Sequence, residues 1–174
     1  METSKKIVAR EINGATRMIS PEDMSFRISV YGVIIEHNAV LLVPQWDGFD
    51  IPGGGIELGE TTEEALKREI HEETGLVVEP RMHQILHVTQ DFFIHPTDGN
   101  SYHYLLLYYP CKLIGGKISD ANFREDEKLY AKAAQWIPME AVSKLKFYNP
   151  VDSASIIAAA HRLKDGPIDE NRTN

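Results

Sequence analysis

The stretch IPGGGIELGETTEEALKREIHEETGLV, from Ile51 to Val77, decides how this chain folds. It opens with a proline and three consecutive glycines. Because glycine lacks a Cβ atom, the backbone of this run is flexible and a ligand can approach it closely, so we expect a turn rather than a regular strand or helix. An acidic run with helical spacing follows, and the glycine-rich turn therefore leads directly into a charged helix.

The predicted helix has its own start and stop signals. Thr61 is followed three residues later by Glu64, which is the spacing of a capping box. Leu66 and Ile70 lie about one turn apart and form an apolar stripe that can pack on a core. Gly75 is suited to end the helix in the left-handed conformation. We therefore expect one helix between Thr61 and Gly75.

Three glutamates of this helix, Glu69, Glu72 and Glu73, share one face because they are spaced at i, i+3 and i+4. Like charges at this spacing repel each other, and more strongly when partly buried, unless a cation lies between them. For these three glutamates the pattern predicts a metal site. For the other charged residues of the stretch we expect a solvated, salt-bridged face, formed by Glu57, Glu63, Glu64 and Lys67.

The composition restricts the class of protein. The 174 residues are 43% hydrophobic and 25% charged, which is typical of a globular chain. A formal net charge of −8 disfavours binding to a nucleic-acid polymer. Cys111 is the only cysteine, which excludes an internal disulfide and favours a buried thiol. No apolar run is long enough for a signal peptide or a membrane span, so we expect a cytoplasmic protein that does not bind membranes.

The remaining chain predicts a mixed sheet with helices on both faces, which is an α/β fold. We expect a single domain over residues 1–165, in which residues 1–24 supply peripheral strands, followed by a polar tail at 166–174. The other predicted elements are a hairpin over Phe26 to Pro44 that turns at Glu36 to Asn38, core strands at Tyr102 to Leu113 and Ala131 to Ile137, helices at Pro138 to Leu145 and Val151 to Leu163, and loops at Gln45 to Asp50, Asp91 to Ser101 and Gly115 to Glu127.

The central stretch resembles the Nudix hydrolase box, G-x5-E-x7-R-E-U-x-E-E-x-G-U, where U is apolar. The resemblance implies an α/β/α sandwich with a mixed central sheet. It also implies a metal-dependent pyrophosphohydrolase that cleaves a nucleoside diphosphate linked to another moiety, with Mg²⁺ or Mn²⁺ as cofactor. Every fixed position of the box is filled here, by Gly54, Glu60, Arg68, Glu69, Ile70, Glu72, Glu73, Gly75 and Leu76.

The resemblance also assigns roles to residues of the box. Glu72 and Glu73 are expected to bind the metal, together with a backbone carbonyl near Gly54. Glu69 is either a further ligand or the base that accepts the proton of the attacking water. Arg68 is expected to organise the carboxylates by pairing with Glu60 or Glu64. The chemistry agrees, because Mg²⁺ and Mn²⁺ are hard cations that prefer oxygen ligands.

Members of the family often take the general base from a distant loop. Glu127 or Glu125, in the acidic stretch before the Trp136 strand, is our candidate for that role. The alternative for either residue is an ordinary solvated acidic loop. The base is therefore expected to be Glu69, Glu125 or Glu127.

The substrate is expected to be a small nucleotide. Of the aromatic residues that can stack on a base, Phe49 and Phe92 are the best candidates because they lie in predicted loops. Asn149 resembles in position a base-reading residue of the nucleoside-triphosphate branch of the family. We therefore expect hydrolysis of a (d)NTP to NMP and pyrophosphate.

The main alternative is an ADP-ribose, nucleotide-sugar or dinucleotide pyrophosphatase. The proline typical of ADP-ribose hydrolases is not at its usual distance, since Asp91 to Phe93 stand there and Pro96 comes later. An alternative of another class is a non-catalytic nucleotide-sensing module, which the intact box disfavours. A homodimer is compatible with the sequence, because dimers are common in families of this kind.

Overall fold

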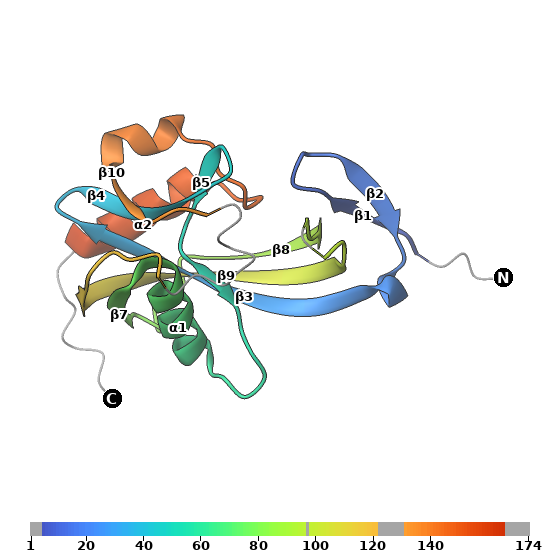
Figure 1. The fold of residues 1–174 in the computed structure, drawn as a ribbon, viewed down its shortest axis with the longest axis horizontal. Helices are drawn as coiled ribbons and strands as arrows, with labels where there is room; N and C mark the ends of the chain where they lie inside the picture. The colour runs from blue at the N-terminus through green and yellow to red at the C-terminus, as the bar shows by residue number, and fades with distance from the viewer. Residues whose placement is uncertain (1–4, 97, 122–130, 166–174) are drawn as a thin grey trace.

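A computed structural model describes residues 5–96, 98–121 and 131–165 of the chain (Figure 1). Its strands are β1 (Ile7–Arg10), β2 (Thr16–Ile19), β3 (Met24–Glu36), β4 (Ala39–Gln45), β5 (Gly48–Asp50), β6 (Gly53–Gly55), β7 (Leu76–Pro80), β8 (His87–Ile94), β9 (Ser101–Gly116) and β10 (Gln135–Pro138). Its helices are the 3-10 helices η1 (Pro21–Asp23) and η3 (Met139–Lys144) and the α-helices α1 (Thr62–Thr74) and α2 (Ser153–Asp165).

The strands form one mixed sheet in the order β10-β4-β3-β9-β8-β1-β2, with β5 on β4, β6 on β3 and β7 on β9. Its centre is the parallel pair of β3 and β9, which stays in register from Met24 opposite Ser101 to Ile34 opposite Cys111. These two long strands run side by side through the molecule in Figure 1. A parallel pair of this length places residues far apart in sequence at matched positions along one surface.

The sheet lies between α1 and α2. Val30 and Ile34 of β3 belong to the core cluster that contains Leu66 and Ile70 of α1. The alternate residues Val33 and Ile35 belong to the cluster that contains Ile156 and Ile157 of α2. Successive side chains of a strand point to opposite faces, so the two helices cover opposite faces of the sheet. The predicted α/β/α sandwich with a mixed sheet is confirmed.

The signals at both ends of α1 act as predicted. Thr61 caps the helix and forms a complete capping box with Glu64. Gly75 ends it at φ 72°, with its N–H donating to the His71 carbonyl. The helix connects β6, which is antiparallel to β3, with β7, which is antiparallel to β9. It thus crosses the central strand pair and carries its acidic face past the glycine-rich strand.

Three sequence expectations about loops are wrong. The glycine run is strand β6, because its backbone pairs with Ser29 to Tyr31 of β3 without needing side chains. The expected loop Gln45 to Asp50 is a hairpin, in which β5 pairs with β4 around Trp46 at φ 46°. The expected loop from Asp91 begins later, because β8 remains paired with β9 up to Ile94. The predicted helix after Pro138 is a short 3-10 helix.

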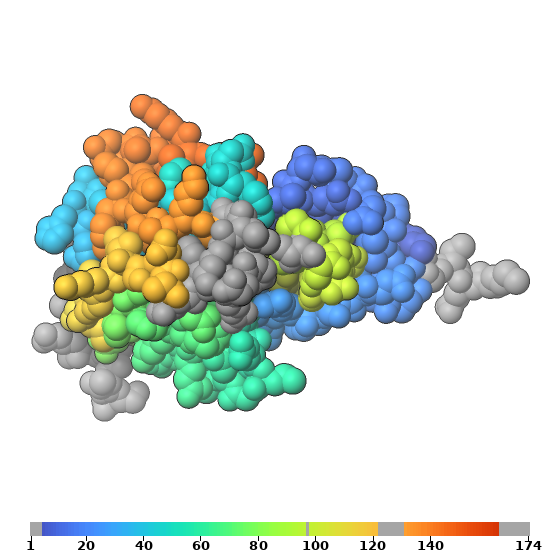
Figure 2. All heavy atoms as spheres, viewed as in Figure 1, coloured from blue at the N-terminus to red at the C-terminus, as the bar shows by residue number. Residues whose placement is uncertain are grey.

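The N-terminal hairpin of β1 and β2 forms the far end of the sheet, as expected for peripheral strands. β1 meets β8 through the pair of Arg10 and Phe93. Figure 2 shows the blue N-terminal hairpin lying beside the yellow-green residues that connect β8 to β9. In the part of the chain that the structure describes, no helix is long and apolar enough to cross a membrane.

The end of α1 gives a prediction about stability. A Cβ atom at Gly75 would lie 2.4 Å from the Lys117 carbonyl oxygen, in a backbone conformation that L-residues rarely adopt. Gly75→Ala is therefore expected to lower the free energy of unfolding by about 2–4 kcal/mol, measured by urea denaturation. Gly59→Ala is the matched control, since Gly59 also has positive φ but nothing lies within 4 Å of its Cβ position. The control should lose only about 1–2 kcal/mol, and equal losses would contradict the contact with Lys117.

Candidate active site

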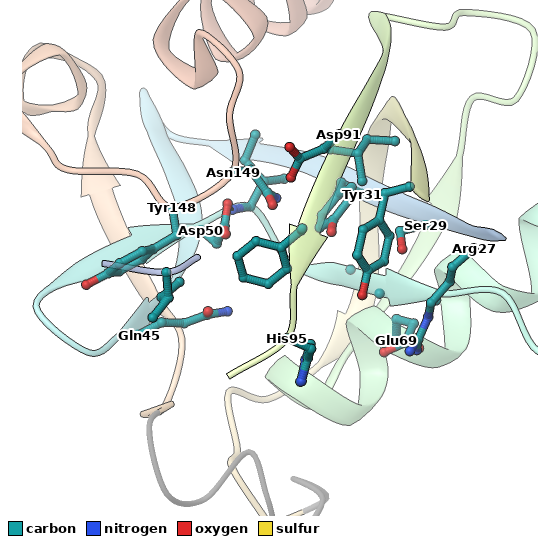
Figure 3. Close-up of a pocket in the computed structure, with 18 of the residues that line it drawn as sticks. Arg27, Ser29, Tyr31, Gln45, Asp50, Glu69, Asp91, His95, Tyr148 and Asn149 are labelled. Atoms are coloured by element: carbon teal, nitrogen blue, oxygen red, sulfur yellow. The ribbon is translucent and has the colours of Figure 1, made fainter. Parts of the chain in front are cut away.

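A cavity of about 180 Å³ lies on the α2 side of the central strands and reaches around the edge formed by β6. It is elongated: Figure 3 shows Tyr148 and Asn149 toward one end and Glu69 and Arg27 toward the other. Its walls come from segments far apart in sequence, namely β1, β3, β5, β6, α1, β8, β9 and the loop before α2.

At the acidic end, α1 presses two glutamates against the glycine strand. Glu73 Oε2 accepts a hydrogen bond of 2.8 Å from the Gly53 N–H. A Cβ atom at Gly54 would lie 2.5 Å from Glu69 Oε2, so only glycine leaves room for this carboxylate. Both side chains line the cavity although the residues are only 3% (Glu69) and 8% (Glu73) exposed. Buried carboxylates are unfavourable unless charge or hydrogen bonds compensate them, and the site supplies both.

Arg68 holds this acidic end together. Its Nε and Nη2 atoms donate to the two carboxylate oxygens of Glu60 at 2.6 and 2.8 Å. Its Nη1 donates to Glu69 at 2.7 Å and lies 3.4 Å from Glu72, and Nη2 also donates to the Gly55 carbonyl at 3.0 Å. The hydrogen bond to Glu60 is the main reason why the pKa of Arg68 is raised. Arg68 therefore stays charged and fixes the direction of the neighbouring carboxylates.

The donor set fits a divalent metal that shares its coordination with a substrate. Among the described residues, no three acidic, histidine or cysteine side chains converge as a closed metal centre. Mg²⁺, however, keeps several waters and binds through one or two carboxylates plus substrate phosphates. Glu69, Glu73 and the carbonyl groups of the glycine strand line one cavity and can supply such a partial shell. The missing Cβ atom at Gly54 is what lets the Glu69 carboxylate lie against this strand.

At the opposite end the cavity is polar but nearly uncharged. Asp50 is 6% exposed, and its burial raises the pKa of the carboxyl to about 7. The Nδ2 of Asn149, which lies beside it in Figure 3, forms no well-aligned hydrogen bond among the described residues, but the Asn149 amide is close enough to Asp50 and Tyr31 to lower the pKa of both groups. Tyr31 stacks on Tyr108 with ring centroids 4.9 Å apart, and burial raises the pKa of both phenols, so they remain neutral. This end therefore offers hydrogen-bonding groups to a flat polar ligand such as a base.

An aromatic rim borders this polar end. Trp46, at the tip of the β4–β5 hairpin, meets Tyr148 edge to face at 4.8 Å. The Tyr148 hydroxyl donates to the Asp47 carboxylate, and Lys146 Nζ donates to the same carboxylate at 2.9 Å. These contacts fix the hairpin tip against the loop that precedes α2.

The N-terminal hairpin forms a further wall of the cavity. Arg10 of β1 donates to both oxygens of Asp91 at 3.0 and 3.2 Å, and its guanidinium lies 4.5 Å from the centre of the Phe93 ring. The same positive charge lowers the pKa of Asp50, without cancelling the effect of burial. A strand expected to be peripheral thus contributes a cation to the cavity.

The structure brings some of the predicted site residues together and not others. Glu69, Glu73, Gly54 and Asn149 line the cavity, whereas Glu72 reaches the site through Arg68. Of the two partners expected for Arg68, the structure shows Glu60, while Glu64 is engaged in the capping box. The candidate bases Glu125 and Glu127 lie outside the described residues.

Neither of the two aromatic candidates reaches the cavity. Phe49 is paired with Phe147 and packs into the α2-side core. Phe92 packs on His103, on the sheet face away from the cavity, and its neighbour Phe93 lines the cavity instead. The residues that sequence reasoning missed include Arg27, Ser29 and Tyr31, which a period of two along β3 could have placed on one face.

The pKa of Asp50 gives a prediction about pH. A carboxyl with a folded pKa near 7 and an unfolded value of about 3.9 stabilises the fold most at low pH, and this contribution declines as pH rises from about 4 to 7. Asp50→Asn, which cannot ionise, should therefore gain stability relative to the wild type by up to about 1.4 kcal/mol per pH unit in this window.

Urea denaturation at pH 5, 6, 7 and 8 measures the effect. Asp47→Asn is the control, because a hydrogen bond from Tyr148 lowers the pKa of Asp47 and its contribution is constant above pH 5. If the difference in the free energy of unfolding between the wild type and Asp50→Asn does not change with pH, the raised pKa of the buried Asp50 carboxyl is contradicted.

Comparison with known proteins places these features in a family. The NUDIX domain family matches residues 25–159. An ADP-ribose pyrophosphatase of Methanocaldococcus jannaschii is 31% identical over 144 residues, which are 80% of this chain and 75% of that protein. A putative mutator protein MutT4 of Mycobacterium tuberculosis is 32% identical over 118 residues, 67% of this chain but only 42% of that protein.

Solved structures agree on the fold. A NUDIX hydrolase from Nitrosomonas europaea superposes with a TM-score of 0.61 at 19% identity, covering 86% of this chain and 98% of that one. An ADP-ribose pyrophosphatase from Streptococcus suis gives a TM-score of 0.60 at 17% identity, covering 82% and 94%. With the family match over residues 25–159 and the buried glutamates on the glycine strand, the chain belongs to the Nudix hydrolases, enzymes that act on pyrophosphate bonds and generally need divalent metal ions.

Proposed function

We propose that this chain hydrolyses nucleoside triphosphates, ribo or deoxy, to the nucleoside monophosphate and pyrophosphate, with Mg²⁺ or Mn²⁺ as the ion. The observation that carries the proposal is the two-ended cavity. Buried carboxylates on a glycine strand line one end, and the hydrogen-bonding groups of Asp50 and Asn149 beside an aromatic rim line the other. A nucleotide has the same polarity, with a charged phosphate chain at one end and a flat polar base at the other.

The reaction adds one water across the bond between the α- and β-phosphates. The water oxygen forms a bond to phosphorus, the bridging P–O bond breaks, and the water proton passes to a carboxylate base. Glu69, Glu125 or Glu127 is the proposed base, of which Glu69 lines the cavity. A bound divalent ion supplies charge neutralisation of the diphosphate and a lowered pKa for the attacking water. Glu73, held by the Gly53 N–H, would supply an oxygen ligand to that ion, and Glu69, held by Arg68, would supply another if it is not the base.

The base is proposed to bind between Asn149, Asp50 and the rim formed by Trp46 and Tyr148. Asn149 Nδ2 forms no well-aligned hydrogen bond among the described residues, although its amide lies close enough to Asp50 and Tyr31 to lower the pKa of both, so a base acceptor could complete its hydrogen bonding. With a pKa of about 7, Asp50 is present in both the donor and the acceptor form near neutral pH. Tyr148, held by Asp47, can provide an apolar surface for stacking.

A second candidate substrate is ADP-ribose. It is supported by the relative from Methanocaldococcus jannaschii, whose name gives that activity and which aligns with 80% of this chain. The base end described above would serve the adenine equally well. A catalytically inactive nucleotide sensor is the candidate of a different class, and the intact set of box residues opposes it.

A substrate panel tests the proposal. Purified chain with Mg²⁺ is incubated with the common and oxidised nucleoside triphosphates, ADP-ribose, nucleotide sugars and dinucleotides, and phosphate, pyrophosphate and monophosphates are quantified. Pyrophosphate and monophosphate in equal amounts from a triphosphate support the proposal. Turnover of ADP-ribose alone would establish the second candidate. Nucleotide binding without turnover of any compound would establish the sensor.

Exchange of single glutamates tests the metal site. Glu73→Gln keeps the size of the side chain but removes its charge, so kcat should fall by about two or more orders of magnitude at saturating Mg²⁺. Glu72→Gln should show whether this residue also binds the metal. Glu63→Gln is the matched control on the same helix, because Glu63 is exposed and pairs only with Lys67 among the described residues. An unchanged rate for Glu73→Gln would remove Glu73 from the site.

A further inference from the structure

The groups at the cavity are arranged in a fixed order along the paired strands β3 and β6. Tyr31, next to the base end, is opposite Gly53, to which Glu73 is bound. Val30 is opposite Gly54, against which Glu69 lies, and Ser29 is opposite Gly55. Two residues further along β3, on the same face as Ser29 and Tyr31, comes Arg27. In an extended strand Arg27 is thus about 13 Å from Tyr31, on the far side of the glutamates from the base end.

The Arg27 guanidinium lies directly against the glycine strand. A Cβ atom at Gly55 would be 2.4 Å from its Nε and Nη2 atoms, so the absence of a side chain at Gly55 is what admits the guanidinium. Gly54 and Gly55 face opposite sides of β6, and they therefore receive a carboxylate on one side and a guanidinium on the other. Figure 3 shows Arg27 and Glu69 at the same end of the cavity.

Arg27 differs from the other arginines of the site in its charge balance. Arg68 is engaged by Glu60, Glu69 and Glu72, and Arg10 is engaged by Asp91. Arg27 has no carboxylate within 4.0 Å among the described residues, and its described partner is the ring of Tyr102 at 5.9 Å. It is therefore a cation that lines the cavity with its hydrogen-bonding capacity still available.

We propose that Arg27 binds the phosphates on the leaving side of the scissile bond, and so forms an anion subsite for pyrophosphate or for the distal phosphate of the substrate. The proposal rests on the proposed function, because that function places the base at the Asn149 end. Along β3 and β6 the base end comes first, then the carboxylates, and then Arg27. A nucleotide bound in this order would therefore bring its distal phosphates to Arg27. A guanidinium binds phosphate oxygens through two parallel hydrogen bonds, which gives both affinity and direction. Its charge also compensates the negative charge that builds up on the departing group.

The experiment uses inorganic pyrophosphate with Mg²⁺ as the probe of this subsite. Dissociation constants for pyrophosphate and for the product monophosphate are measured by calorimetry on the wild type, Arg27→Met and Arg27→Lys, and KM and kcat are measured for the best triphosphate of the panel. Arg27→Met should weaken pyrophosphate binding and raise KM by about 10- to 100-fold, while monophosphate binding changes by less than about threefold. Arg27→Lys should restore part of the loss, because it keeps the charge but not the two-pronged geometry.

Arg17→Met is the matched control. Arg17 lies in the N-terminal hairpin, is paired with Glu11 and does not line the cavity, so its loss should change the dissociation constant of neither pyrophosphate nor the monophosphate. The melting temperature of each unliganded variant shows whether the fold is kept, and the comparison of wild type with Arg27→Lys decides the question if Arg27→Met does not fold. Unchanged pyrophosphate binding in the Arg27 variants, or an equal loss for pyrophosphate and monophosphate, overturns the proposal. A wild type that binds pyrophosphate in an Arg27-dependent manner but hydrolyses no nucleotide would instead refute the proposed function and leave the subsite in place.

Discussion

The site depends on the close contact between two buried glutamates and a strand that has no side chains. Glu73 lies near the sheet only because the Gly53 N–H pairs with its carboxylate, and Glu69 only because Gly54 carries no Cβ atom. Burial of two carboxylates so close together is unfavourable by several kcal/mol unless each is compensated. Arg68 compensates Glu69, and Glu60 in turn holds Arg68 by accepting from its Nε and Nη2 atoms. The constraint therefore extends from the glycine strand through the middle of α1 to Glu60, just before the helix begins.

This constraint also explains why the glycine run is a strand and why it sits at an edge. β6 pairs only with β3 among the described strands, so its other edge is left to receive carboxylates from α1. A side chain at Gly54 would expel Glu69, and one at Gly55 would expel Arg27. Three consecutive glycines are thus required by contacts on both faces of one short strand. The conformational freedom of glycine is used at Gly53, whose φ of 147° is rarely adopted by L-residues, although the backbone itself is fixed by β3 on one side and by Glu73 on the other.

The sequence predicts those parts of the site that depend on interactions between residues close together in the chain. Helix α1, its cap at Thr61 and its end at Gly75 depend on residues within a few positions of each other, and the sequence predicts all three correctly. Strand β6 depends on pairing with β3, more than twenty residues away, which no local pattern reveals. The two aromatic candidates do not line the cavity for a related reason. Phe92 and Phe93 are adjacent residues of the same type, so the sequence does not distinguish them. Only the register of β8 on β9 decides that Phe93 faces the cavity.

The two ends of the cavity are formed by different segments of the chain, and this affects substrate specificity. The cavity-lining glutamates and glycines come from one continuous stretch, whereas Arg10, Asp50, Phe93 and Asn149 come from four separate segments. Arg10 is also the counter-charge of Asp91 and acts on Asp50, so the N-terminal hairpin influences the protonation of a group near Asn149. A change in that hairpin can therefore alter which ligand groups the polar end accepts without touching a glutamate. The same Nudix stretch can thus serve different substrates, because the hydrogen-bonding character of the distant end is set by segments other than α1, the helix that carries Glu69 and Glu73.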